Sequence, residues 1–152
     1  MTQAATTGTV PKDRIDQSTR PYRILLIEDN VVAAKALETL LKQTGHTVEV
    51  AHTGQAGIEA ARKSKQEVVL CDIGLPDLDG YQVARTLRLE PELKWCVLVA
   101  ITGYGQEADK RRALEAGFNA HVTKPVDVQE LERLLAELDT EQELLLPVPE
   151  NS

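Results

Sequence analysis

From residue 22 onward, short apolar runs alternate with longer segments in which apolar residues recur at helical spacing. The short runs predict strands at 22–27, 47–51, 67–71, 96–101 and 119–123. The longer segments predict helices at 31–43, 54–64, 80–89, 106–116 and 128–138. Strands that alternate with helices are typical of a parallel sheet with helices on both faces. The sequence therefore predicts an α/β fold with a doubly wound five-stranded parallel sheet, and the pattern alone leaves the strand order open.

Two predicted elements have particularly clear features. Asn30 can cap the helix at 31–43, and Gly45 follows its C-terminal end. In the strand at 47–51, valines alternate with polar residues, as they do in edge strands. The helix at 31–43 is expected to pack on the sheet through Ala33, Ala36, Leu37, Leu40 and Leu41.

The length of 152 residues suits one domain with additional tails. Residues 1–20 have almost no apolar periodicity and are expected to be a flexible leader. Residues 21–139 form the predicted domain. Residues 140–152 are acidic and then contain prolines, so they are expected to be a tail or the start of a linker.

Composition and charge exclude several classes of protein. The net charge of −7 argues against nucleic acid or an anionic membrane as the main partner. The longest apolar run, at 95–101, is too short to span a bilayer, and no secretion signal is present, so we expect a cytoplasmic protein. Cys71 and Cys96 lie in apolar runs and are expected to be buried free thiols. The basic run at 110–112 is expected to be a solvated helix face.

Polar residues follow four of the five predicted strands. Glu28 and Asp29 follow the first strand, Asp72 the third, Thr102 the fourth and Lys124 the fifth. Parallel strands bring these ends to one edge of the sheet, where open α/β sheets bind ligands. Each residue also has a structural explanation: an acidic pair can complement a helix dipole, and an Asp can form a turn. Five such residues at four strand ends favour a site.

The chemistry of these side chains indicates phosphoryl handling. Three neighbouring carboxylates repel one another unless a cation lies among them, and Mg²⁺ prefers oxygen ligands of this kind. Lys124 supplies a positive charge and Thr102 a hydroxyl donor, which suit the oxygens of a phosphoryl group. The sequence has no P-loop and no nucleophile elbow. If a phosphoryl group is transferred, Asp72 is the expected acceptor.

These stretches resemble the receiver domain of bacterial two-component response regulators. The resemblance lies in ILLIEDN at 24–30, DIGLPDLDG at 72–80, TGY at 102–104 and KP at 124–125, and it extends over roughly residues 22–138. It implies the flavodoxin-like strand order 2-1-3-4-5. It also implies a cytoplasmic signalling module and phosphoprotein, which transfers a phosphoryl group to itself and is not an enzyme with an external substrate.

The resemblance implies a role for each site residue. Asp72 would be the phosphoacceptor, and Thr102 and Lys124 would contact the phosphoryl group once it is present. The implied Mg²⁺ ligands are Asp29, Asp72 and the backbone carbonyl of Gly74, with Glu28 acting through water. The bond before Pro125 would be cis.

The resemblance also implies a switch and partners. The switch position three residues before Lys124 holds His121, where the family commonly has Tyr or Phe, and Tyr104 is the next candidate. The phosphodonor would be a histidine kinase or a histidine phosphotransfer protein. The downstream partner would bind the fourth helix, fifth strand and fifth helix.

Alternatives remain at the level of sequence. An aspartyl-phosphate phosphatase of the haloacid dehalogenase type usually has a second Asp two residues after the nucleophile, and here that position holds Gly74. A receiver-like docking surface without phosphorylation is disfavoured by the intact acid, Thr and Lys set. The sequence at 103–106 and 113–117 is most similar to that of receivers in hybrid histidine kinases. The chain is therefore expected to be either a stand-alone receiver or part of a longer protein.

Overall fold

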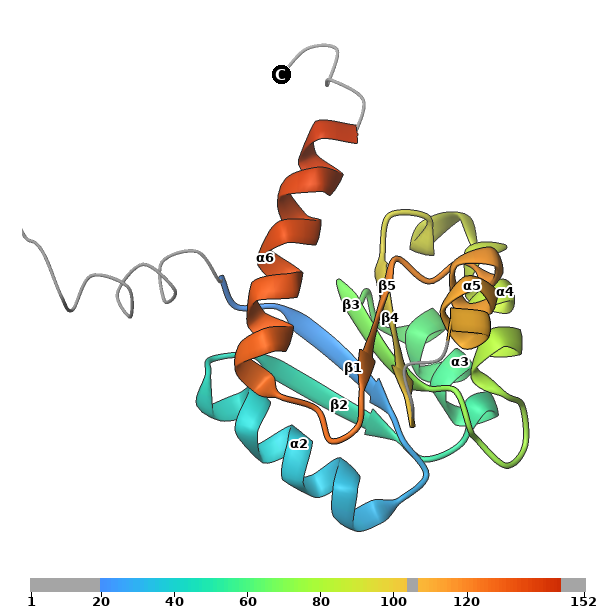
Figure 1. Cartoon of the computed structure of the whole chain (residues 1–152), viewed down its shortest axis with the longest axis horizontal. Coiled ribbons are helices and arrows are strands. Elements are labelled where there is room, and N and C mark those ends of the chain that lie inside the picture. The colour runs from blue at the N-terminus through green and yellow to red at the C-terminus, as the bar shows by residue number, and fades with distance from the viewer. Residues whose placement is uncertain (1–19, 104–106, 146–152) are drawn as a thin grey trace, which may run out of the picture. The chain divides into compact units, whose positions relative to one another are not determined.

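The computed structural model of this chain describes residues 20–103 and 107–145 (Figure 1). Its contacts divide the chain into two compact units. The unit Pro21–Val128 contains the whole sheet, and the described residues of the other unit are Arg20 and 129–145.

The sheet has five parallel strands in the order β2-β1-β3-β4-β5, which confirms the predicted architecture and order. Every predicted strand and helix is present, with ends within one or two residues of those expected, except at the C-terminal helix. The strands are β1 Arg23–Ile27, β2 Thr47–Ala51, β3 Val68–Asp72, β4 Val97–Thr102 and β5 Ala120–Thr123. The helices are α2 Val31–Gln43, α3 Gly54–Lys63, α4 Gly80–Arg88, the short 3₁₀ helix η1 Pro91–Leu93, α5 Glu107–Ala116 and α6 Val128–Leu145.

The strands are in register at their carboxyl ends. Ile27 pairs with both Ala51 and Cys71, and Asp72 pairs with Ile101. Thr102 pairs in turn with Thr123. The residues that follow β1, β3, β4 and β5 are therefore delivered to the same edge of the sheet, as the sequence predicted.

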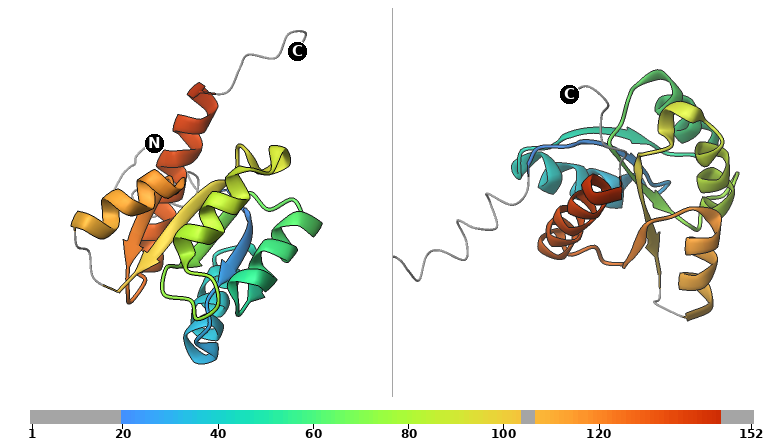
Figure 2. Two further views of the ribbon diagram at one scale, coloured as in Figure 1. Left: turned by 90° about the vertical axis from the view of Figure 1, so that its right-hand side faces the viewer. Right: turned by 90° about the horizontal axis from the view of Figure 1, so that it is seen from above.

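Helices α3, α4 and α5 cover one face of the sheet, and α2 covers part of the other (Figure 2). The central strands β1, β3 and β4 are almost entirely buried, as is typical of the interior strands of a parallel sheet. β2 at the edge alternates exposed and half-buried residues, which confirms the expected edge strand. The core under α3–α5 is built from apolar residues of the strands and helices: Leu25, Ile27, Val69, Cys71, Leu98, Ala100, Ile58, Ala61, Tyr81, Val83, Ala84, Leu87, Ala113, Ala116 and Phe118.

The predicted contact face of α2 is partly wrong. Ala34, Leu37 and Leu41 are the buried residues of this helix. Ala33, Ala36 and Leu40, which were expected to pack inward, are exposed. Apolar residues surround more than half of the helix circumference, so periodicity could not select which stripe contacts the sheet. The N-cap is confirmed, because the Asn30 Oδ1 accepts a hydrogen bond from the Ala33 amide at 2.9 Å.

The last helix is longer than expected. α6 continues to Leu145, past the boundary predicted at residue 139. Residues 140–145 include Glu, Gln and Leu, which favour helix, and the first proline after them is Pro147. In the same unit, the Arg20 Nε lies 3.2 Å from the Asp139 Oδ2. In the described part of the chain, no helix combines the length and apolar character that a membrane span requires.

Candidate functional site: a carboxylate and lysine cluster at the strand ends

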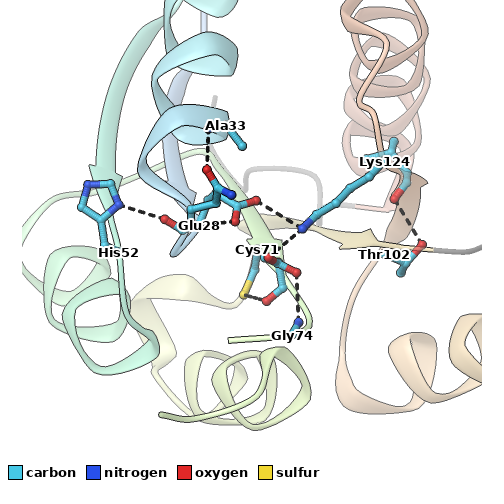
Figure 3. A network of polar contacts seen from close by, with 10 residues as sticks. Glu28, Ala33, His52, Cys71, Gly74, Thr102 and Lys124 are labelled. Carbon is cyan, nitrogen blue, oxygen red and sulfur yellow. Dashed lines mark hydrogen bonds and ion pairs between the residues drawn. The ribbon is translucent and has the colours of Figure 1, made fainter. Parts of the chain in front are cut away.

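The five predicted residues meet at the carboxyl edge of the sheet. Asp72 and Thr102 are the last residues of β3 and β4, and both are buried. Glu28 and Asp29 directly follow β1, and Lys124 directly follows β5. Figure 3 shows the Lys124 side chain extending across the strand ends toward the Glu28 carboxylate.

Lys124 is the centre of the polar network. Its Nζ donates a hydrogen bond to the Asp72 Oδ2 at 2.9 Å and lies 3.6 Å from the Glu28 Oε1. Burial alone would lower the pKa of Lys124, but the hydrogen bond to Asp72 and the charges of Asp72 and Glu28 outweigh it and raise this pKa. Lys124 is therefore charged at neutral pH and neutralises part of the carboxylate cluster.

The two buried carboxylates are held by backbone amides. The Gly74 amide donates to the Asp72 Oδ1 at 2.9 Å, so both oxygens of Asp72 have hydrogen bonds. The Asn30 amide donates to the Glu28 Oε2 at 3.1 Å. Burial raises the pKa of Glu28, the Asn30 amide opposes this, and the negative charge of Asp72 raises it further. The cluster is therefore short of positive charge.

Glu28, Asp29 and Asp72 form a set of oxygen ligands. Each offers a carboxylate oxygen, and these oxygens all lie within 4.8 Å of one another. Glu28 and Asp72 are buried, whereas Asp29 is exposed. A hard divalent cation with several waters suits such a set, because Mg²⁺ takes one or two carboxylates directly and relieves their repulsion. The donor chemistry of these three residues therefore fits Mg²⁺.

The loop between Asp72 and α4 is fixed from two sides. The Asp77 carboxylate accepts hydrogen bonds from the amides of Gln55 and Gly54, at 2.9 and 2.8 Å, which tie the loop to the start of α3. These bonds lower the pKa of Asp77 to about 2. At the other end, a Cβ on Gly80 would lie 2.6 Å from the Ile73 Cα, so the close approach of α4 requires glycine. Asp72 therefore lies at the end of a buried strand, and the loop that follows it is fixed in position by hydrogen bonds and close packing.

Thr102 and Lys124 are linked through β5. The Thr102 Oγ1 donates to the Val122 carbonyl at a long 3.4 Å, and the Lys124 amide donates to the Thr102 carbonyl at 2.8 Å. The peptide bond between Lys124 and Pro125 is cis, as the resemblance implied. On the other side of the cluster, the His52 Nδ1 donates to the Glu28 carbonyl at 2.9 Å.

A cleft of about 550 Å³ opens over these residues. Its lining includes all the predicted site residues of the strand ends, together with the backbone of Gly74: Glu28, Asp29, Asp72, Gly74, Thr102 and Lys124. His121 is not among the lining residues. It lies on β5, is half-buried and pairs with Ala100. Tyr104, the second switch candidate, lies outside the described residues.

The cleft also has lining residues that the sequence did not assign to the site. Among them are Tyr81 at the start of α4 and Asp109 and Arg112 on α5. The Arg112 guanidinium lies 4.2 Å from the centroid of the Tyr81 ring. The basic run at 110–112 was predicted as a solvated face, and Arg112 is indeed exposed, but this ring contact was not expected. Only the packing of α4 beside α5 brings the two residues together.

Comparison with known proteins gives one consistent family. Residues 24–136 match the model of the response regulator receiver domain. The cell cycle response regulator CtrA of Brucella ovis is 37% identical over 109 residues, which cover 72% of this chain and 46% of that protein. The chain therefore spans about half the length of the curated relatives it matches.

Solved structures agree with this. The receiver domain of sensor histidine kinase PA1611 from Pseudomonas aeruginosa, which holds a magnesium ion in its active site cleft, is 30% identical with a TM-score of 0.72 over 78% of this chain and 98% of its own. The receiver domain of Saccharomyces cerevisiae Ssk1, solved with the phosphotransfer protein Ypd1, is 26% identical with a TM-score of 0.76 over 84% of this chain and 94% of its own. The chemotaxis regulator CheY4 of Vibrio cholerae, 19% identical with a TM-score of 0.73 over 78% of this chain and 99% of its own, shares the fold. From its match over residues 24–136 and its similarity to CtrA, this chain belongs to the response-regulator receiver domain family.

Proposed function

We propose that this receiver accepts a phosphoryl group on Asp72 from a phosphorylated histidine, in a Mg²⁺-dependent reaction. The observation that carries the proposal is the position of Asp72. Its carboxylate lies at the cleft, 2.9 Å from the Lys124 Nζ and within 4.8 Å of the oxygens of Glu28 and Asp29. The Asp72 carboxylate, as the nucleophile, therefore has a cation and a set of metal ligands beside it.

The chain's own residues have distinct parts in the transfer. One carboxylate oxygen of Asp72 forms a bond to phosphorus while the bond from phosphorus to the histidine nitrogen breaks, and the electron pair leaves with the imidazole. Lys124 pairs with the charged oxygens of the group, and the Thr102 hydroxyl turns from the Val122 carbonyl to donate to them. Asp29, Asp72 and the Gly74 carbonyl would hold Mg²⁺, with Glu28 acting through water, and the ion would supply positive charge beside the transferred group. The chain acts on itself and turns over no external substrate.

A protein donor needs a surface beside the cleft, and α2 offers one. An apolar groove of about 430 Å³ is lined by α2, through the exposed residues Ala33, Ala36 and Leu40 and the buried Leu37, and by Pro125 and Val126 after β5. Glu28 and Lys124 line both this groove and the cleft. A histidine-bearing protein seated on this groove would stand next to Asp72. We propose the groove as the docking site of that donor, a histidine kinase or a histidine phosphotransfer protein.

The output would be read elsewhere on the domain. His121 pairs with Ala100, two residues before Thr102, and paired residues share a face of the sheet. His121 and Thr102 therefore lie on the face that α5 covers. We propose that movement of Thr102 is passed to His121, and that a downstream protein reads the change on α5 and β5.

Acetyl phosphate, a small phosphodonor, tests this function directly. With Mg²⁺, intact-mass measurement is expected to show one added phosphoryl group, mapped to Asp72. The Asp72→Asn variant and wild-type protein in EDTA are expected to remain unlabelled. A phosphoryl group on another residue of the wild-type chain would overturn the assignment of Asp72.

A further inference from the structure

The cleft is lined by a second cation besides Lys124. Arg112 reaches it from α5, on the face of the sheet opposite α2 (Figure 2). Lys124 is already engaged by the carboxylates of Asp72 and Glu28. Arg112 is exposed, and its guanidinium rests on the ring of Tyr81, 4.2 Å from the centroid. An aromatic ring is a neutral partner, so the charge of Arg112 is not neutralised by this contact.

Tyr81 is suited to hold the Arg112 guanidinium weakly while the cleft contains no anion. It is the second residue of α4, 4% exposed, and its hydroxyl is buried near Asp109. Burial raises the pKa of Tyr81, and the nearby charge of Asp109 acts in the same direction. The side chain therefore stays neutral and presents its ring. A cation–π contact at an exposed site is weak, so a stronger partner can displace it.

The charges of the cleft define that partner. Four carboxylates line it, from Glu28, Asp29, Asp72 and Asp109, against the two cations Lys124 and Arg112. These groups carry a net charge of −2, so an incoming phosphate dianion meets a negative field. A bound Mg²⁺ would bring the cleft only to neutrality and would leave no surplus positive charge for the dianion. A guanidinium has five N–H donors in a planar fork that matches phosphate oxygens, which an ammonium lacks.

We propose that Arg112 is an anion-positioning residue of this cleft. The Arg112 guanidinium moves away from the Tyr81 ring and binds the phosphoryl oxygens of a small acyl phosphate beside Asp72. The inference rests on the proposed function and adds to it the class of phosphodonor whose binding depends on Arg112. A small donor cannot use the α2 groove, so charge in the cleft is its means of binding. In the step itself, a carboxylate oxygen of Asp72 bonds to phosphorus, the bond from phosphorus to the acyl oxygen breaks, and acetate leaves with the electron pair.

The test compares phosphorylation rates over a range of acetyl phosphate concentrations at fixed Mg²⁺. Arg112→Gln is expected to lower the rate at low donor concentration about three- to tenfold, between the value of an exposed ion pair and that of a charge-assisted hydrogen bond. The loss is expected in the half-saturating concentration, with the rate at high donor concentration retained. Arg112→Lys is expected to recover part of the rate.

Arg111→Gln is the matched control. Arg111 is the neighbouring exposed arginine on α5 and does not line the cleft, so the variant makes the same change in net charge at another position. The slowing of the reaction by added salt is expected to be weaker in Arg112→Gln than in Arg111→Gln. A purely structural role of Arg112 would not move this salt dependence.

Two outcomes are distinguished. If Arg112→Gln and Arg111→Gln react at equal rates with equal salt dependence, the role of Arg112 is wrong and the proposed function stands. If wild-type protein is not labelled on Asp72, the proposed function itself fails. Arg112→Met keeps an aliphatic stem against Tyr81 without the charge, and it replaces Arg112→Gln if that variant does not fold. Wild-type kinetics in the folded Met variant would equally overturn the inference.

Discussion

At the scale of single residues, the buried carboxylate of Glu28 makes the stability of the metal-free domain depend on pH. Burial is the largest cause that raises the pKa of Glu28 above its ordinary value of 4.5, and the charge of Asp72 raises it too. The folded state therefore binds this proton more tightly than the unfolded state. Glu28 favours folding fully below pH 4.5, and this contribution is lost as the pH rises through the folded pKa.

The variant Glu28→Gln is expected to remove this dependence. Without Mg²⁺, its melting temperature at neutral pH is expected to exceed that of the wild type, because one of two crowded carboxylates is gone. Near pH 4 the two proteins are expected to melt at similar temperatures. Thermal unfolding in EDTA across this pH range measures the effect. A variant less stable than the wild type at neutral pH would show that the ion pair with Lys124 outweighs the repulsion.

His121 is the residue whose role is tested best by spectroscopy. It shares a sheet face with Thr102, so the proposed shift of Thr102 toward a phosphoryl group would change its surroundings. The imidazole signals of His121 are expected to move when beryllofluoride and Mg²⁺ are added, and to stay unchanged in Asp72→Asn. If α5 responds while His121 does not, the switch passes through another residue, and Tyr104 is the next to test.

At the scale of elements, α2 presents one buried stripe to the sheet and a second, apolar stripe to the groove. Ala36 and Thr39 are both exposed on this helix, but only Ala36 lines the groove. Ala36→Glu is expected to slow phosphotransfer from a phosphorylated histidine protein at least about tenfold, since a buried charge disrupts an apolar interface. Acetyl phosphate is expected to label the same variant at the wild-type rate.

Thr39→Glu is the control for this change, because it adds the same charge to the same helix outside the groove. It is expected to leave both reactions unchanged. Equal slowing by Ala36→Glu and Thr39→Glu would mean that net charge, and not the groove, governs the approach of the donor. Equal rates for Ala36→Glu and wild type would place the donor on another surface.

At the scale of the whole domain, a metal bound at one edge of the sheet is expected to stabilise a fold whose single tryptophan lies at the other. Trp95 precedes the first residue of β4, whereas the site follows the last residues of the strands. With a millimolar dissociation constant, ~10 mM Mg²⁺ is expected to add about 1.4 kcal/mol to the free energy of unfolding. Trp95 fluorescence of the folded protein is expected to stay constant in the same titration. An unchanged melting temperature would count against the metal site.

The sequence by itself determined the fold class and the predicted residues of the site. The alternation of strands with helices requires a parallel sheet. In a parallel sheet the carboxyl ends of the strands meet at one edge, so the residues that end the apolar runs lie together there: Glu28, Asp29, Asp72, Thr102 and Lys124. This pattern of apolar runs and polar ends lies within each segment of the sequence, so it can be recognised without knowing which segments pack together in space. The cap at Asn30 and the edge character of β2 are local features of the same kind.

Tertiary structure decided what depends on neighbours distant in the chain. Which stripe of α2 is buried follows from where β1 and β2 contact it, since apolar residues cover most of that helix. The pairing of Arg112 with Tyr81 exists because α5 packs beside α4, and no spacing within either helix encodes it. The hydrogen bonds of Asp77 to the start of α3 likewise join segments that the sequence separates. Periodicity fixes what each element can bury, and packing chooses the partner.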